Sequence, residues 1–381
     1  MKKLFLFCAM LTLASSAYAI KIVSGPMVQN VTEDSFSVVW TTDKRAVAWV
    51  EIAPNDGTHF YACERPKYFQ TFLGRKMIGT THCVTIPRLE KATTYRYRIF
   101  AQEVLGKGGR TMYGRVASTK VYKCEPLYVT TLDHAKESIK CVIVNDIHGN
   151  ETLEAMLTNK VNVKDTDFVF YNGDMASMEN TYVFRIWKSF VNTSVNLFAK
   201  ETPLVMVRGA GEAPGKLGEL FTNVFPTTTG EPYQIIRQGP VCFIILDSGG
   251  DQKDKAANTD FDAHRKKEAL WLKQALQQPE VKEAKYRVAL MHIPPVANAS
   301  VVSKQLNKLF VPILNEADID IMLCGYTHQH QLHEAGTVAK FPILENSHLH
   351  TITLLANPGS MILKIDDING QQVKTLTFEN K

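Results

Sequence analysis

The sequence predicts an all-β sandwich over residues 20–130 followed by an α/β layered domain over residues 138–381. Three observations predict this division. Apolar and polar side chains alternate with period two in the first part, which is typical of half-buried strands. Continuous apolar strands alternate with helical stretches in the second part. Each of several of those apolar strands is followed by a loop that carries an Asp or a His.

The first nineteen residues read as a secretory signal peptide, before either domain. Lys2 and Lys3 are followed by an apolar stretch over residues 4–16 and by an Ala17-Tyr18-Ala19 cleavage site. The apolar stretch is shorter than the roughly 20 residues that a bilayer-spanning helix needs, and no later segment is apolar enough. We therefore expect export to the periplasm or the outside, with no transmembrane segment.

Charge and cysteine content exclude several classes of function. Removal of Lys2 and Lys3 lowers the formal charge from +5 to +3, and no dense Lys/Arg block remains, so no nucleic-acid partner is expected. No C-x-x-C spacing occurs, which excludes a thiolate zinc site. Cys141, Cys242 and Cys324 lie in apolar runs and are expected to be buried thiols. Cys63, Cys83 and Cys124 could include one disulfide, and the sequence does not specify which two would pair.

Strand patterns fill residues 20–130. Phe36, Val38 and Trp40 share one face of a strand over residues 35–40, and Tyr95, Tyr97 and Ile99 share one face of another over 93–99. Further strands are expected over 45–52 and 83–86, with turns at 55–57 and 106–109. Trp40 and Tyr97 are interpreted as core of the sandwich, and the polar stretch 129–138 as the linker.

Strands and helices alternate after residue 138. The expected strands cover residues 140–145, 168–172, 204–208, 233–237, 241–246, 286–292 and 319–324. The expected helices cover 151–157, 182–191, 262–278 and 303–315, and a hairpin is expected at Asn369-Gly370. This alternation predicts a layered α/β domain with its functional residues in the loops that follow the strands.

Five Asp and His residues occupy those loops: Asp146, His148, Asp174, His292 and His328. Their convergence on one sheet edge would place carboxylates and imidazoles together, and these groups are suitable ligands for Fe, Mn or Zn. Individual structural roles are the alternative, such as a helix cap for Asp146 or a hydrogen-bonded core histidine for His292.

The order of these loops resembles that of the calcineurin-like metallophosphoesterases. The residues that carry the resemblance are Asp146-Ile-His148, Gly173-Asp174, Arg208-Gly-Ala-Gly-Glu212, His292 and Gly325-Tyr-Thr-His328. The mature chain is similar to their bacterial subgroup with a purple-acid-phosphatase-type, fibronectin-III-like N-terminal domain. The resemblance implies an αββα-type catalytic domain. It also implies hydrolysis of a small phosphate ester or a phosphoprotein by divalent or trivalent metal ions.

The resemblance assigns roles to individual residues. It implies that Asp146, His148, Asp174 and His328 hold the first metal, that Asp174 bridges to a second metal, and that His292 belongs to the second. Two metals about 3.5–4 Å apart would clamp phosphate oxygens and activate a bound water.

The sequence departs from the family pattern on one half of this site. Ala210 replaces a metal-binding Asn, Gly211 replaces the His that would protonate the leaving group, and Tyr326 replaces a His. The loop over residues 296–300 also lacks the family's later His. We therefore expect one firmly bound metal, a weak second site with Tyr326 as an additional candidate ligand, and slow turnover. The alternative is a catalytically inactive phosphatase-like protein that binds metal or phosphate.

Other side chains are candidates for the missing functions. His330, His348 and His350 could supply a proton or a ligand, and the alternative is that they are solvent-facing loop histidines. Arg208 could bind phosphate or form a buried ion pair. The sequence specifies no oligomeric state.

Overall fold

The computed structural model describes residues 19–106, 111–120, 126–147, 150–158, 163–176, 186–214, 218–251, 259–296 and 300–380. The expected signal peptide up to residue 18, Cys124 and the candidate ligand His148 lie outside the described residues. Among the described residues, no helix is both long and apolar enough to cross a membrane.

Strands alone make up the regular structure of the N-terminal part, as far as it is described. They are β1 (Ile22–Gln29), β2 (Ser35–Pro54), β3 (Lys67–Phe69), β4 (Thr71–Phe72), β5 (Arg75–Lys76), β6 (Ile78–Pro87), β7 (Thr94–Val104), β8 (Tyr113–Ser118) and β9 (Leu127–Thr130). Seven of these described strands join in one hydrogen-bonded sheet, and β4 pairs with β5 alone.

The long strand β2 replaces the two separate strands expected over 35–40 and 45–52. Its first half pairs with β1 and β6, its second half pairs with β7 and β3, and a register shift lies between Thr41 and Ala46. No Gly or Pro interrupts residues 41–45, so the chain bends there without leaving the sheet. The all-strand composition agrees with the sequence, whereas a fibronectin-III-like sandwich stays a prediction.

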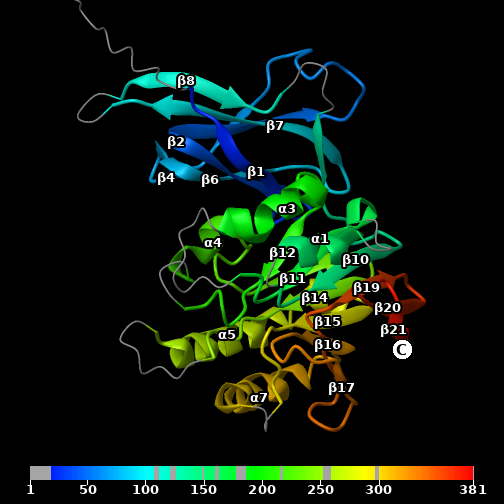
Figure 1. Cartoon of the computed structure of the whole chain (residues 1–381). Helices are drawn as coiled ribbons and strands as arrows, with labels where there is room; N and C mark the ends of the chain where they lie inside the picture. The colour runs from blue at the N-terminus through cyan, green and yellow to red at the C-terminus, as the bar shows by residue number, and fades with distance from the viewer. Residues whose placement is uncertain are drawn as a thin grey trace, which may run out of the picture.

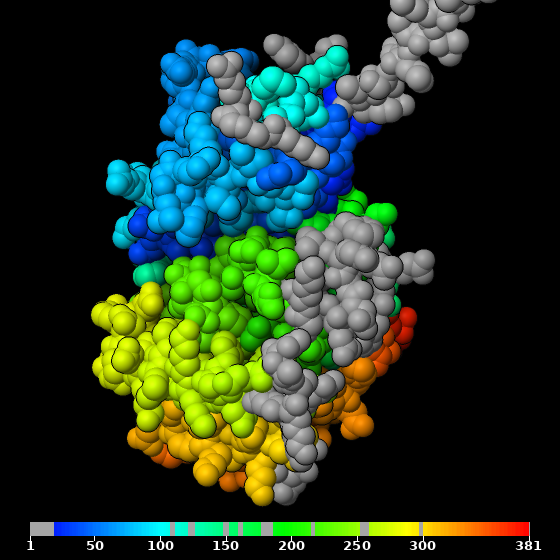
Figure 2. All heavy atoms as spheres, turned by 90° about the vertical axis from the view of Figure 1, so that its left-hand side faces the viewer, coloured from blue at the N-terminus to red at the C-terminus, as the bar shows by residue number. Residues whose placement is uncertain are grey.

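The N-terminal strands pack directly on the rest of the chain. Trp40 and Tyr97 are fully buried in a hydrophobic cluster that continues to Ile143 and Phe243. The Tyr97 hydroxyl donates to the backbone oxygen of Lys200 at 2.5 Å. Figures 1 and 2 show the blue N-terminal strands resting on the green segment that includes α3 (Asn192–Ser194), with no solvent gap in the space-filling view.

The expected linker over residues 129–138 begins inside the sheet. Val129 belongs to β9, which pairs with β7, and Thr131 and Leu132 are buried. The Leu132 amide donates to the carbonyl oxygen of Thr32 at 2.9 Å. The linker over residues 129–138 stays a prediction, although the apolar Val129 and Leu132 provide buried contacts that a polar average over the segment conceals.

Two mixed sheets form the C-terminal part among the described residues. The first has the order β12-β11-β10-β19-β20-β21 and the second the order β13-β14-β15-β16-β18-β17. The first consists of β10 (Ile139–Val144), β11 (Phe168–Asn172), β12 (Leu204–Val207), β19 (His350–Ala356), β20 (Ser360–Asp367) and β21 (Gln372–Glu379). The second consists of β13 (Gln234–Gln238), β14 (Val241–Ile245), β15 (Tyr286–Leu290), β16 (Ile321–Cys324), β17 (Gln331–His333) and β18 (Ile343–Glu345).

Helices cover the outer face of each sheet, which gives four layers. The helical segments are α1 (Asn150–Thr158), η1 (Val163–Asp165), η2 (Trp187–Val191), α3, η3 (Val195–Ala199), η4 (Gly218–Leu220), α4 (Phe221–Val224), α5 (Phe261–Ala275), α6 (Pro279–Lys282) and α7 (Val301–Leu314). Alternate residues of β10 face the two sides: Ile143 packs between the sheets, whereas Val142 and Val144 pack under α1 and η2. The expected α/β layered fold is confirmed.

This arrangement brings distant loops to one edge. β10, β11 and β12 are parallel, as are β14, β15 and β16, so their carboxyl ends lie together in each sheet. Hydrogen bonds join the two sheets at this edge, including one from the Asn172 side-chain amide to the Leu323 carbonyl oxygen at 3.1 Å.

Candidate metal centre

Four of the five predicted ligands meet at this edge. His292 Nε2 lies 3.2 Å from Asp174 Oδ2 and 3.7 Å from Asp146 Oδ1. His328 Nε2 lies 3.3 Å from the same Asp146 oxygen. One donor atom each from Asp146, Asp174 and His292 falls within a 4.8 Å cluster. The loops after β10, β11, β15 and β16 therefore converge as expected, while metal binding by these residues stays a prediction.

The backbone turns sharply where each loop begins. Asp146, Asp174, Tyr326 and His328 have φ values of 53°, 52°, 73° and 59°. Residues other than Gly, Asn and Asp rarely adopt this left-handed backbone conformation, and residues that do so concentrate at functional sites. The turns direct the side chains back over the ends of the strands.

Neighbouring groups fix the orientation of Asp146 and His292. Asp146 Oδ2 accepts hydrogen bonds from the Asn145 side-chain amide at 2.8 Å and from the Tyr326 backbone amide at 2.9 Å. The His292 ring donates from Nδ1 to the Asn172 carbonyl oxygen at 2.8 Å, which leaves the lone pair of the neutral ring on Nε2.

The remaining atoms of these two side chains fit a cation. Asp146 Oδ1 and His292 Nε2 are buried and have no hydrogen-bond partner among the described residues. Asp174 Oδ2 is near Nε2 but lacks hydrogen-bond geometry. Burial lowers the pKa of His292, but the Asp174 and Asp146 carboxylates outweigh it and raise the pKa to about 9. The same negative potential favours a metal ion between the two acids.

Glu212 holds the loop that carries Asp174. Its Oε2 accepts hydrogen bonds from the amides of Asp174 at 2.8 Å and Gly209 at 2.9 Å, and its Oε1 accepts from the amides of Met175 and Ala176. A Cβ at Gly209 would lie 2.3 Å from Asp174 Oδ1, so glycine is required there. Sequence reasoning gave Glu212 no role, although the retained Gly209-x-x-Glu212 pattern was the available signal.

The three replaced family positions have distinct surroundings. Ala210 is buried in the apolar cluster of the second sheet. Gly211 offers only its amide, which donates to Asp174 Oδ1 at 2.6 Å. The Tyr326 hydroxyl donates to Asp251 Oδ2 at 3.4 Å, and burial together with Asp251 raises the pKa of the phenol. Tyr326 as a phenolate ligand stays a prediction.

Arg208 forms a buried ion pair with Asp247. Its Nε donates to Asp247 Oδ1 at 3.1 Å, its terminal amine contacts Asp247 Oδ2, and only 8% of the residue is exposed. His264 Nε2 lies 2.7 Å from Asp247 Oδ2. Burial raises the pKa of Asp247, but Arg208 and His264 outweigh it and hold that pKa well below its usual range. Of the two roles considered for Arg208, the structure supports the ion pair.

The candidate substitute histidines divide into two groups. The His348 ring centroid lies 4.9 Å from that of His328, beside the metal centre. His330 packs instead on His350, with ring centroids 5.2 Å apart. The Nδ1 atoms of His330 and His350 are buried, whereas both residues are half-buried overall, so the alternative of solvent-facing loop histidines stays open.

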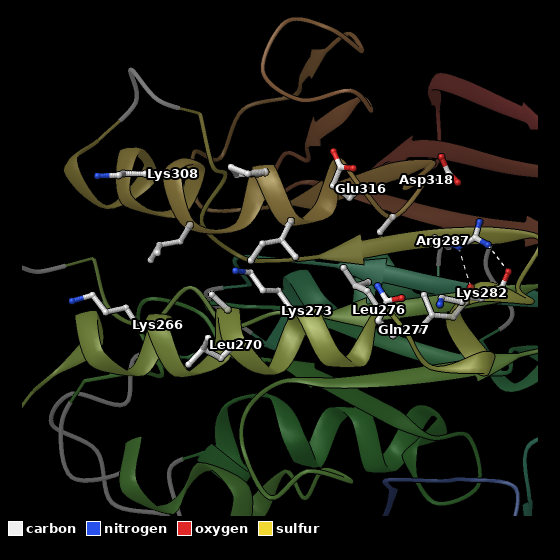
Figure 3. A pocket seen from close by; sticks show the side chains of 16 residues that line it. Lys266, Leu270, Lys273, Leu276, Gln277, Lys282, Arg287, Lys308, Glu316 and Asp318 are labelled. Carbon is white, nitrogen blue, oxygen red and sulfur yellow. Dashed lines mark hydrogen bonds between the residues drawn. The ribbon is translucent and has the colours of Figure 1, made fainter.

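One large cavity lies away from the candidate metal centre. It is a groove of about 900 Å³ between α5 and α7, lined by Leu270, Lys273, Leu309 and Ile313 among others, and it contains none of the candidate ligands (Figure 3). This groove between α5 and α7 is therefore separate from the candidate metal centre.

Several known proteins are similar to this chain. Solved structures that match this chain include a conserved uncharacterized protein, a predicted phosphoesterase, from Streptococcus pneumoniae TIGR4 (12% identity, 65% of this chain and 100% of that chain, TM-score 0.30). A further example is Vacuolar Protein Sorting 29 from Cryptosporidium parvum (12% identity, 64% of this chain and 100% of that chain, TM-score 0.32). Another is Yfce, a phosphoesterase from E. coli (11% identity, 62% of this chain and 98% of that chain, TM-score 0.30). No curated protein matches the chain.

The family comparison covers just over half of the sequence. The family described as calcineurin-like phosphoesterase matches residues 139–332. This span contains Asp146, Asp174, His292 and His328 and the strands that position them. The chain therefore belongs to the calcineurin-like phosphoesterase family.

Proposed function

We propose that this protein is a metal-dependent phosphoric ester hydrolase with one strong and one weakened metal site, acting on small phosphomonoesters or phosphoproteins. The observation that carries the proposal is the facing pair of buried atoms, Asp146 Oδ1 and His292 Nε2, for which the described part of the chain offers no hydrogen-bond partner. A third donor, on Asp174, lies in the same cluster.

The ligands divide unequally between the two sites. Asp146, Asp174 and His328, together with His148, would hold one ion, and Asp174 and His292 would contribute to the second. Bound divalent ions of this class, such as Mn, Zn or Fe, neutralise phosphate charge and lower the pKa of water. With Ala210 and Tyr326 at two family ligand positions, the second site has too few donors for firm binding.

The residues of this chain orient the reacting groups but leave one role open. Glu212 accepts a hydrogen bond from the Asp174 backbone amide, and the Gly211 amide donates to the Asp174 carboxylate, so both hold Asp174 in place. The proton-donor position holds Gly211, which has no side chain, so the leaving group would take its proton from water or from a neighbouring imidazole. His348, beside His328, is the candidate imidazole.

The proposal extends to export and domain organisation. Lys2, Lys3 and the apolar stretch after them support removal of residues 1–19 and a periplasmic or secreted location. The strand-only composition of the N-terminal part supports a fibronectin-III-like domain over 20–130 of the purple-acid-phosphatase type, followed by the catalytic domain over 138–381.

Metal content and turnover test the central proposal. Purified protein should hold at least one Mn, Zn or Fe ion per chain and hydrolyse p-nitrophenyl phosphate slowly. Installing Ala210→Asn, Gly211→His and Tyr326→His together should raise turnover by about 10²–10⁴-fold, the usual contribution of general acid catalysis. Asp146→Asn added to this variant should abolish the gain, and Lys266→Gln, at an exposed lysine of α5, should leave it unchanged.

Two results would contradict the proposal. One is less than one metal ion per chain after dialysis against excess metal. The other is turnover in the restored variant that does not respond to Asp146→Asn.

A binding protein without turnover is the second candidate. The burial of Ala210 among apolar side chains favours it, because an asparagine amide introduced there needs new hydrogen-bond partners. Calorimetric titration with inorganic phosphate would show metal-dependent binding, and the wild-type protein would release no p-nitrophenol above an Asp146→Asn background.

A further inference from the structure

A short hairpin in the N-terminal part presents apolar side chains to solvent. β4 and β5 pair through Thr71 with Lys76 and Phe72 with Arg75, and the Met77 amide extends the ladder by donating to the Gln70 carbonyl oxygen at 2.9 Å. Every residue from 71 to 77 is exposed. At the tip, Phe72 is 65% and Leu73 is 87% exposed, and no other large apolar residue among the described ones exceeds 64%.

The turn itself is unfavourable for the residue that occupies it. Leu73 and Gly74 connect the strands with φ values of 48° and 77°. Turns with two left-handed residues favour Asn-Gly or Asp-Gly, because a larger side chain clashes with the backbone in this region. Since Leu73 is almost fully exposed, no contact within the chain offsets this strain.

Positive charge flanks the apolar tip. Residues 66–77 contain Lys67, Arg75 and Lys76 and no Asp or Glu. The Lys76 ammonium lies 3.5 Å from the ring centroid of Phe69, and the Lys67 ammonium lies 5.7 Å from that of Trp49. Arg75 and Lys76 thus follow the apolar tip by two and three residues, and Lys67 precedes it by five, at the base of the hairpin. In Figure 1 the hairpin, labelled β4, lies at the margin of the N-terminal part, away from the C-terminal sheets.

We infer that this hairpin docks the protein on an anionic lipid surface. Phe72 and Leu73 would enter the headgroup boundary, and Arg75, Lys76 and Lys67 would contact lipid phosphates. The charge of the hairpin selects this occupant over a neutral apolar pocket. The inference is independent of the catalytic proposal, because no residue of the hairpin belongs to the metal centre.

Vesicle sedimentation tests the inference with the full-length mature protein. The wild-type protein should sediment with vesicles of phosphatidylcholine and phosphatidylglycerol at 3:1 and much less with pure phosphatidylcholine. Phe72→Ser with Leu73→Asn should weaken binding by more than about tenfold, since each buried apolar side chain contributes at least about that factor. Asn at position 73 suits the turn, so unfolding would not explain the loss.

Charge and control variants sharpen the test. Arg75→Gln with Lys76→Gln should weaken binding to the anionic vesicles by about 25-fold, because each cation near the surface contributes about fivefold to the affinity. Leu105→Ser, at a leucine that is 53% exposed outside the hairpin, should bind like the wild type. Phe72→Trp adds a fifth tryptophan, and the difference in emission between this variant and the wild-type protein should shift to the blue on vesicles.

Three outcomes would overturn the inference. The wild-type protein could fail to bind anionic vesicles, or the Phe72→Ser, Leu73→Asn variant could bind them unchanged. Alternatively, sedimentation velocity without lipid could show self-association that this variant abolishes, which would identify a second copy of the chain as the occupant.

Discussion

Gly173→Ala is the substitution that tests the geometry of the metal centre most directly. Gly173 has a φ of 86°, and a Cβ built on it would lie 2.3 Å from His292 Nδ1 and 2.4 Å from Cγ. These contacts are shorter than van der Waals distance, so the buried imidazole would have to move. Its hydrogen bond to the Asn172 carbonyl oxygen would be lost with it.

The expected cost follows from these contacts. An alanine in the left-handed region costs about 1–2 kcal/mol. Overpacking a buried site adds about 1–3 kcal/mol, and a buried donor left without a partner adds about 1–3 kcal/mol. We therefore expect Gly173→Ala to lower the free energy of unfolding by about 3–8 kcal/mol.

Gly230→Ala is the matched control. Gly230 also has a left-handed φ, 74°, but nothing lies within 4 Å of an added Cβ, so only the backbone term of about 1–2 kcal/mol applies. Urea denaturation of the two variants, with calorimetric titration of Mn²⁺, measures both stability and metal affinity. If the two variants lost equal stability and Gly173→Ala kept wild-type affinity for Mn²⁺, His292 would not be held as described.

Three further predictions concern charge, pH and metal. Arg208→Ala should cost about 3–5 kcal/mol in urea denaturation because it leaves the Asp247 carboxylate buried without its cation, whereas Lys340→Ala, at a surface ion pair with Glu316, should cost less than about 1 kcal/mol. Burial lowers the pKa of His82 from 6.5 to about 4, so the unfolded state binds the extra proton between these values. Stability should therefore fall by about 3 kcal/mol as the pH drops from 6.5 to 4, and His82→Gln should remove this dependence in thermal unfolding measured across that range. Mn²⁺ at about 100 times its dissociation constant should add about 2.7 kcal/mol to the wild type, EDTA should reverse this, and Asp146→Asn should show neither effect in thermal unfolding.

The site could be located from sequence because its residues follow strands. A continuous apolar run that ends in Asp146, Asp174 or His292 defines both the strand and the position of the polar side chain. Parallel pairing then requires the carboxyl ends to lie together. The proximity of these residues followed from local patterns and one rule of sheet topology.

The partners of Arg208 and Tyr326 could not be predicted in this way. Arg208 and Asp247 are 39 residues apart, and Tyr326 and Asp251 are 75 apart, so each pairing depends on side-chain packing between separate loops. The continuity of β2 was missed for a related reason. Polar residues 41–45 resemble a break between strands, although pairing with β1 extends to Thr42, pairing with β6 resumes at Ala46 after Thr41, and pairing with β7 begins at Ala46.

The position of β19 has a consequence for when the metal centre forms. β10, which delivers Asp146, is flanked by β11 on one side and by β19 on the other, more than 200 residues further along the chain. Asn145 also exchanges hydrogen bonds with Asn346. A growing chain therefore lacks one border of the Asp146 strand until residue 356 has been synthesised. Assembly of the ion-binding loops should be a late folding event, and metal should enter a nearly complete protein instead of guiding its early collapse.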